Sequence, residues 1–95
     1  MNVPFAAQGP LTDATAVDAE IRSILARHAK IAPSVEQVES GADLFAAGLD
    51  SNSVISVMLA IEESFDIEIP EDRLTRASFS SIQRLTALVL EVVAC

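Results

Sequence analysis

The sequence predicts an all-α domain, a bundle of three main helices and one short helix with a long first loop. Apolar residues make up 51% of the 95 positions, but they include four Phe and neither Trp nor Tyr, so Ala, Val, Ile and Leu dominate. Three Gly and four Pro are too few for the many tight turns of an all-β chain. In three segments apolar residues recur every three or four positions, as in helices that bury one face.

The first helix is expected to begin after Thr12 or Asp13, either of which suits an N-cap, and to fade at Lys30. Residues 1–11 are expected to be a disordered N-terminal tail, which leaves 12–95 as the folded domain. This tail has neither the basic start of a signal peptide nor a membrane span, so we expect a cytoplasmic protein. The apolar face of the helix comprises Val17, Ile21, Ile24, Leu25 and His28.

A long connection follows, from about residue 32 to residue 50. Gly41 and Gly48 are expected to supply its bends. A connection of this length in so small a domain is usually functional. Its apolar residues, which would tether it to the core, are Val35, Val38, Leu44, Phe45 and Leu49.

The second helix is expected over residues 51–64. Ile55 and Leu59 lie beside its buried face and would stay partly exposed. Such an apolar flank beside acidic residues is typical of a docking surface, although packing on a neighbouring helix would explain it equally well. The buried face itself comprises Val54, Val57, Met58, Ile61 and Phe65.

After a short extended link, residues 71–74 are expected to form one helical turn. Ser78 or Ser80 would then cap the last helix. The apolar face of that helix comprises Phe79, Ile82, Leu85, Val89 and either Val92 or Val93.

The formal net charge is −8, and it is unevenly distributed. Between Ile31 and Asp72 there is no Lys or Arg. Such a surface repels nucleic acid and anionic membranes and attracts basic partners, although acidity can also serve solubility alone. The ten acids in this window are Glu36, Glu39, Asp43, Asp50, Glu62, Glu63, Asp66, Glu68, Glu71 and Asp72.

Several kinds of chemistry lack the residues they need, so we expect no enzyme and no metal site. The one histidine, His28, is expected on the apolar face of its helix, as a packed or half-exposed residue rather than a base. The single cysteine, Cys95, excludes an internal disulfide, and no cluster of Cys and His has the spacing of a zinc site. Asp50 and Asn52 imitate the start of a calcium loop, but the required Gly and Glu are missing further on.

The remaining candidate is the pair Asp50-Ser51, at the junction of the long loop and the second helix. Taken alone, the pair reads as helix capping. The surrounding sequence adds Asp-Leu-Phe at 43–45 upstream and Glu-Glu-Ser-Phe-Asp at 62–66 downstream, followed by Ile-Pro-Glu-Asp at 69–72.

This assembly resembles the acyl carrier protein family over about residues 21–92. The resemblance implies the acyl-carrier-protein-like helical bundle and a monomer. It also implies that Ser51 accepts 4′-phosphopantetheine from coenzyme A, with Asp50 assisting, and that the thiol of this arm holds cargo as a thioester. A helix start suits a phosphate physically, because its free N–H groups carry partial positive charge.

The resemblance further implies the partners. These are a phosphopantetheinyl transferase, a dedicated acyl or aminoacyl loading ligase, and downstream transferases with basic docking patches. Rim charges of this kind mainly raise association rates and select partners. The residues expected to bind partners are Asn52, Ile55, Leu59, Glu62, Glu63 and Asp66.

Departures from the family pattern indicate a specialised carrier rather than one for general fatty-acid synthesis. Asn52, Ser53 and Ser56 stand where members usually have a leucine followed by acids. The stretch 74–82 is similar to small bacterial carriers charged with amino acids by ligases related to aminoacyl-tRNA synthetases. An aminoacyl cargo and an acyl or polyketide cargo both stay open. The alternative from another class is an unmodified acidic helical adaptor that binds a basic partner.

Overall fold

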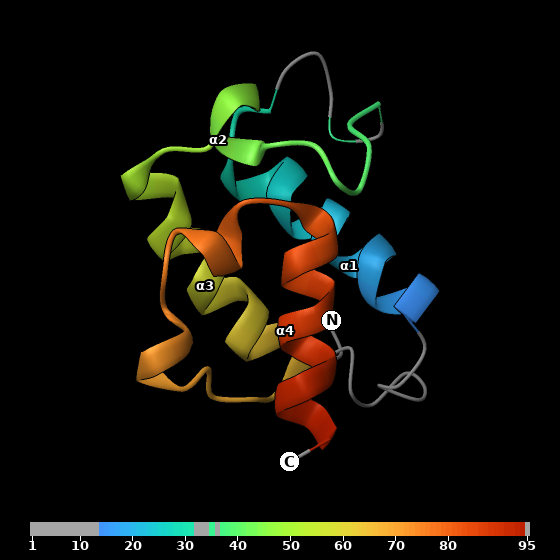
Figure 1. Cartoon of the computed structure of the whole chain (residues 1–95), viewed down its shortest axis with the longest axis vertical. Coiled ribbons are helices and arrows are strands. Elements are labelled where there is room, and N and C mark those ends of the chain that lie inside the picture. The colour runs from blue at the N-terminus through green and yellow to red at the C-terminus, as the bar shows by residue number, and fades with distance from the viewer. Residues whose placement is uncertain (1–13, 32–34, 36, 95) are drawn as a thin grey trace.

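The computed structural model describes residues 14–31, 35 and 37–94, and this part of the chain is all-helical, as predicted (Figure 1). The three long helices are α1 (Ala14–His28), α3 (Ser51–Phe65) and α4 (Ile82–Ala94). The connections contain a four-residue helix, α2 (Leu44–Ala47), and two 3₁₀ turns, η2 (Glu71–Arg73) and η3 (Ala77–Phe79).

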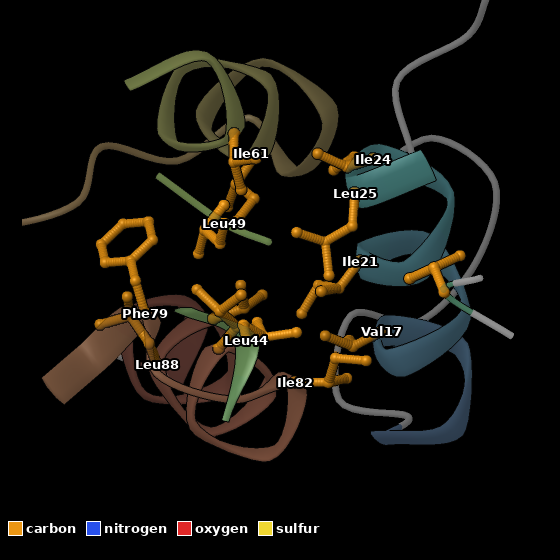
Figure 2. Packing of buried hydrophobic residues seen from close by; sticks show 14 of the residues in the cluster. Val17, Ile21, Ile24, Leu25, Leu44, Leu49, Ile61, Phe79, Ile82 and Leu88 are labelled. Atoms are coloured by element: carbon orange, nitrogen blue, oxygen red, sulfur yellow. The ribbon is translucent and has the colours of Figure 1, made fainter. Parts of the chain in front are cut away.

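One core joins the three long helices, and α1 contacts both α3 and α4. Ile21, Ile61 and Leu85 are fully buried, and each comes from a different helix. Burying a side chain of this size contributes about 1.5–3 kcal/mol of hydrophobic stabilisation. Figure 2 shows that Leu44 and Leu49, from the connection between α1 and α3, point into the same core.

The buried face of α1 consists of Val17, Ile21, Ile24 and Leu25, as predicted. The prediction that His28 belongs to this face is wrong, because this residue is exposed. The helix ends at His28, one turn beyond the last buried position, so its side chain does not reach the core. The predicted N-cap at Thr12 or Asp13, the tail over 1–11 and Cys95 lie outside the described residues.

The long connection is held to α1 by Arg22. One guanidinium nitrogen, Nη1, donates to the carbonyl oxygens of Val35 and Val38, each at 2.7 Å. Nε of Arg22 donates to Asp18 at 2.7 Å, and Ser40 bridges Arg22 and Asp18 through its hydroxyl. The side chain of Arg22 therefore replaces the hydrogen bonds that a regular helix or strand would give this segment.

The chain after α3 differs in detail from the prediction. The turn expected at 71–74 is present as η2, but η3 was not predicted. Ser78 and Ser80 do not cap the last helix. The cap is Ser81, whose hydroxyl accepts from the backbone N–H of Arg84 at 3.0 Å. Phe79 is buried from η3 rather than from α4, which moves the start of the helix to Ile82.

Within the described ranges, no group of three or more His, Cys, Asp or Glu side chains is placed to hold a metal ion. None of the helices described there is long and apolar enough to cross a membrane.

Candidate functional site

Gly48 brings the chain from α2 toward α3, and only glycine fits this position. Its φ is +131°, a value that L-residues with a side chain rarely adopt. A Cβ atom at Gly48 would lie 2.0 Å from the carbonyl oxygen of Lys30, at the end of the first helical segment. The backbone of the loop is therefore in direct contact with the residues that follow α1.

Two leucines fix the loop on either side of Gly48. Leu44 is fully buried and Leu49 nearly so. The N–H of Leu49 donates to the carbonyl of Leu44 at 2.9 Å, and the N–H of Leu44 donates to the carbonyl of Ser80 at 2.7 Å. The segment that leads into α3 is thus attached both to the core and to the chain before α4.

Asp50 is the N-cap of α3. Its carboxylate accepts from the backbone N–H of Ser53 at 2.8 Å, and its carbonyl accepts the first helical bond, from Val54, at 2.9 Å. The hydrogen bond from Ser53 lowers the pKa of the Asp50 carboxyl below its ordinary value of 3.8. Asp50 is fully ionised at neutral pH and holds the first turn of α3 in place.

Ser51 is the first residue of α3, and its side chain is exposed. The cap of α3 is the Asp50 carboxylate, so the Ser51 hydroxyl is not used for capping. Among the contacts of the described residues, that hydroxyl makes no hydrogen bond. It stands at the positive end of a 15-residue helix, where N–H groups and the helix dipole favour an anion. An exposed serine at this position, whose hydroxyl makes no hydrogen bond to a described residue, fits a phosphate-linked cofactor.

Four of the six predicted docking residues lie along the side of α3 that faces away from the core. Ile55 and Leu59 are 57% and 55% exposed, so the flank does not pack on a neighbouring helix. Asn52 lies on the same side one turn earlier, and Glu63 one turn later, and both are exposed. The structure therefore brings these four residues into one stripe that begins beside Ser51.

The two other predicted docking residues differ from this stripe. Glu62 is half-buried, and its carboxylate accepts from the backbone N–H of Ile69 at 2.9 Å. It thereby holds the chain that follows the helix. Asp66 is exposed and ends α3 in the left-handed conformation, with φ of +54°. Glu62 therefore stabilises the segment after α3, while the charge of Asp66 is exposed on the surface.

Sequence reasoning missed the interactions of two basic side chains, one with Asp50 and one with Phe45 of α2. The positive charge of Lys30 contributes to lowering the pKa of Asp50, although the two residues lie 20 positions apart. Arg76 stacks on the ring of Phe45, with its guanidinium carbon 3.8 Å from the ring centre. No local pattern reveals either pairing, because both depend on how the connections fold back.

Comparison with known proteins matches residues 19–89 to the family described as "Phosphopantetheine attachment site". The aminoacyl carrier protein of Agrobacterium fabrum is 45% identical over 69 residues, which cover 73% of this chain and 83% of that protein. Aminoacyl carrier protein 1 of Bradyrhizobium diazoefficiens is 31% identical over 70 residues, 74% of this chain and 73% of that protein.

A solved structure gives the same result. It contains a carrier protein from Agrobacterium tumefaciens in complex with ATP and an engineered glycine:[carrier protein] ligase of Bradyrhizobium japonicum. The match has a TM-score of 0.74 and 44% identity, and it covers 77% of this chain and 95% of the matched chain. The chain therefore belongs to the family of phosphopantetheine-dependent carrier proteins, and the relatives that it matches include aminoacyl carrier proteins.

Proposed function

We propose that Ser51 is the attachment residue of the 4′-phosphopantetheine arm and that the cargo of this carrier is an amino acid. The observation that carries the proposal is the position of Ser51, exposed at the first residue of α3 with its hydroxyl left free by the Asp50 cap. When bound, the arm supplies a terminal thiol that holds the cargo as a thioester.

Loading the arm is a substitution at phosphorus. The hydroxyl oxygen of Ser51 forms a bond to the phosphorus on the pantetheine side of coenzyme A, and the phosphoanhydride bond breaks. Adenosine 3′,5′-bisphosphate leaves, and the proton of the hydroxyl passes to a base of the transferase. The chain contributes a fixed and accessible nucleophile, because Gly48, Leu49 and Asp50 hold the backbone on which Ser51 stands. The catalytic groups belong to the partner enzymes.

An amino acid as cargo is supported by the relatives and by the surface next to Ser51. Two matched relatives are aminoacyl carrier proteins, and a matched carrier was solved with a glycine:[carrier protein] ligase. Asn52 and Ser56, which share the exposed side of α3, are polar and uncharged. Such a surface suits a ligase with a docking site different from that of enzymes that recognise acids next to the arm. A cytoplasmic location and a monomeric state stay predictions from the sequence.

The ligase would dock on the stripe of Asn52, Ile55, Leu59 and Glu63, with Asp66 at its end. The two exposed apolar side chains supply contact area, and the acids attract a basic rim. A carrier must also be released after each transfer, and a small apolar patch with charges around it favours fast association and fast release.

The proposal is tested in two successive steps on the same protein. Incubation with coenzyme A, Mg²⁺ and a broad-specificity phosphopantetheinyl transferase should raise the intact mass by one phosphopantetheinyl unit. A glycine:[carrier protein] ligase with ATP and glycine should then add one glycyl group, which mild hydroxylamine removes because a thioester is labile. A first gain without a second, across a panel of amino acids, would refute the aminoacyl cargo. Absence of the first gain would favour the unmodified adaptor.

A further inference from the structure

Lys30, which lies two residues after the end of α1, contacts the loop that leads to Ser51. A Cβ at Gly48 would be 2.0 Å from the carbonyl oxygen of Lys30 and 3.2 Å from its carbonyl carbon. Asp50 and Ser51 follow Gly48 by two and three residues. Leu49, which lies between Gly48 and Asp50, is buried and anchors this segment to the core. The backbone of Lys30 is therefore fixed at short range from the start of α3.

The side chain of Lys30 is exposed, and it forms no ion pair with another residue that the structure describes. The ion pairs of the described residues join Arg22 to Asp18, Arg27 to Glu20 and Arg73 to Glu91, and none includes Lys30. Its charge does reach Asp50, where it adds a small contribution to the lowered pKa of that carboxyl. Lys30 is also the only lysine of the chain.

Attachment of the arm adds negative charge at the start of α3. The phosphodiester formed on Ser51 carries one permanent negative charge, and it stands one residue from the ionised Asp50. No Lys or Arg occurs between Ile31 and Asp72 to offset these two charges. Lys30 immediately precedes this window, and the fold places its backbone beside Gly48. The long, flexible side chain of lysine lets its ammonium group approach the Asp50 carboxylate or the phosphodiester.

We propose that the Lys30 ammonium pairs with the phosphodiester on Ser51 and holds the root of the arm at the edge between the end of α1 and the start of α3. The inference rests on the proposed function, because it requires the arm to be attached to Ser51. Lys30 is a positioning residue in this account, since it touches the linkage and not the reacting thiol. Neutralising the linkage would also lower the electrostatic cost of placing it beside Asp50.

The single lysine makes the test direct. Protein labelled with ¹³C and ¹⁵N lysine gives one set of ε signals, which are recorded by NMR before and after attachment of the arm with coenzyme A and transferase, with attachment confirmed by intact mass. The Lys30 ε signals should shift when the arm is attached, because the ammonium group gains a charge-assisted contact with the phosphodiester, and the shift should shrink at high salt. Ser51→Ala protein treated in the same way should show no change.

A matched probe separates pairing from a general increase in negative charge. In the double variant Lys30→Gln, Arg27→Lys, the only lysine sits three residues earlier, at an exposed position in the last turn of α1. Its ε signals should shift much less when the arm is attached. An equal shift at both probes, or no shift at Lys30 in protein whose mass confirms attachment, would overturn the inference and leave the proposed function intact. No gain in mass would refute both.

Discussion

The geometry of the loop before Ser51 depends on Gly48. Replacing it by Ala would force a side chain into a positive φ and drive Cβ against the carbonyl oxygen of Lys30. We expect Gly48→Ala to lower the free energy of unfolding by about 2 kcal/mol or more, as measured by urea denaturation.

Gly41→Ala is the matched control for that substitution. A Cβ at Gly41 would meet only the side chain of Gln83, at the ordinary contact distance of 3.6 Å, and its φ is not positive. The control should change stability by less than about 1 kcal/mol. Equal effects of the two substitutions would show that the loop is not held as described.

Asp50 gives the stability of the fold a defined dependence on pH. Its carboxylate accepts the N–H of Ser53 in the folded state only, so its folded pKa lies below the ordinary value of 3.8. The resulting stabilisation is fully present above pH 3.8 and is lost as the pH falls through the folded pKa. Asp50→Asn keeps a capping side chain but does not titrate.

The measurement is urea denaturation of wild type and Asp50→Asn at a series of pH values from 7 to 3. Any advantage of the wild type at neutral pH should shrink as the pH falls below about 4. A difference in unfolding free energy that stays constant over this range would contradict the assignment of Asp50 as an ionised cap.

At the scale of elements, the connection before α2 depends on Arg22. Its guanidinium serves the carbonyls of Val35 and Val38 and also pairs with Asp18. Arg22→Ala should therefore cost about 2–3 kcal/mol of stability, because charge-assisted bonds are lost and backbone acceptors are left without a donor. Amide hydrogen exchange over residues 37–45 should accelerate more than exchange in α3.

Arg27→Ala is the control for the Arg22 variant, because it removes an exposed arginine from the same helix. Arg27 approaches Glu20 only to 3.9 Å, and its side chain is 54% exposed. Its removal should change stability by no more than about 0.5 kcal/mol. Comparable losses for both arginines would refute the special role of Arg22.

The long amphipathic elements could be predicted from sequence, and the connections could not. Periodicity placed α3 within one residue of its observed end and identified Ile55 and Leu59 as exposed. It missed α2, because four residues show no helical period and this helix depends on the Asp43 cap, whose carboxylate accepts from Phe45 at 2.9 Å. It also placed the last N-cap too early, since the burial of Phe79 in a 3₁₀ turn follows from tertiary packing.

The same division applies to the site. Asp50 and Ser51 were singled out because they stand where a periodic helix begins, which is a local signal, and because the sequence around them resembles the acyl carrier protein family. The proximity of Lys30 to Asp50 and the stacking of Arg76 on Phe45 were not found, because they join segments far apart in the chain. Glu62 was expected on the docking surface, yet its carboxylate is bound to the N–H of Ile69.

At the scale of the whole molecule, one side of α3 is the surface on which we propose that the loading ligase docks. Leu59→Ser should leave the free energy of unfolding within about 0.5 kcal/mol of wild type, because the side chain is already 55% exposed. It should raise the KM of the ligase for the carrier that bears the phosphopantetheine arm by about tenfold, since an apolar contact at the centre of an interface is worth about 1–2 kcal/mol.

Leu74→Ser is the matched control for this prediction. Leu74 is 42% exposed but lies between the two 3₁₀ turns, away from α3 in the sequence. It should leave the KM of the ligase nearly unchanged. Equal effects of the two substitutions, or none for Leu59, would place the docking surface elsewhere.

The most direct test of the account is to locate the modification on the chain. Wild type, Ser51→Ala and Ser56→Ala proteins are treated with coenzyme A, Mg²⁺ and transferase, and their intact masses and fragment spectra are compared. Ser56 is an exposed serine of the same helix and controls for the general availability of a hydroxyl. The account predicts one phosphopantetheinyl unit on wild type and on Ser56→Ala, mapped to Ser51, and none on Ser51→Ala. A gain on Ser51→Ala, or none on wild type, would contradict it.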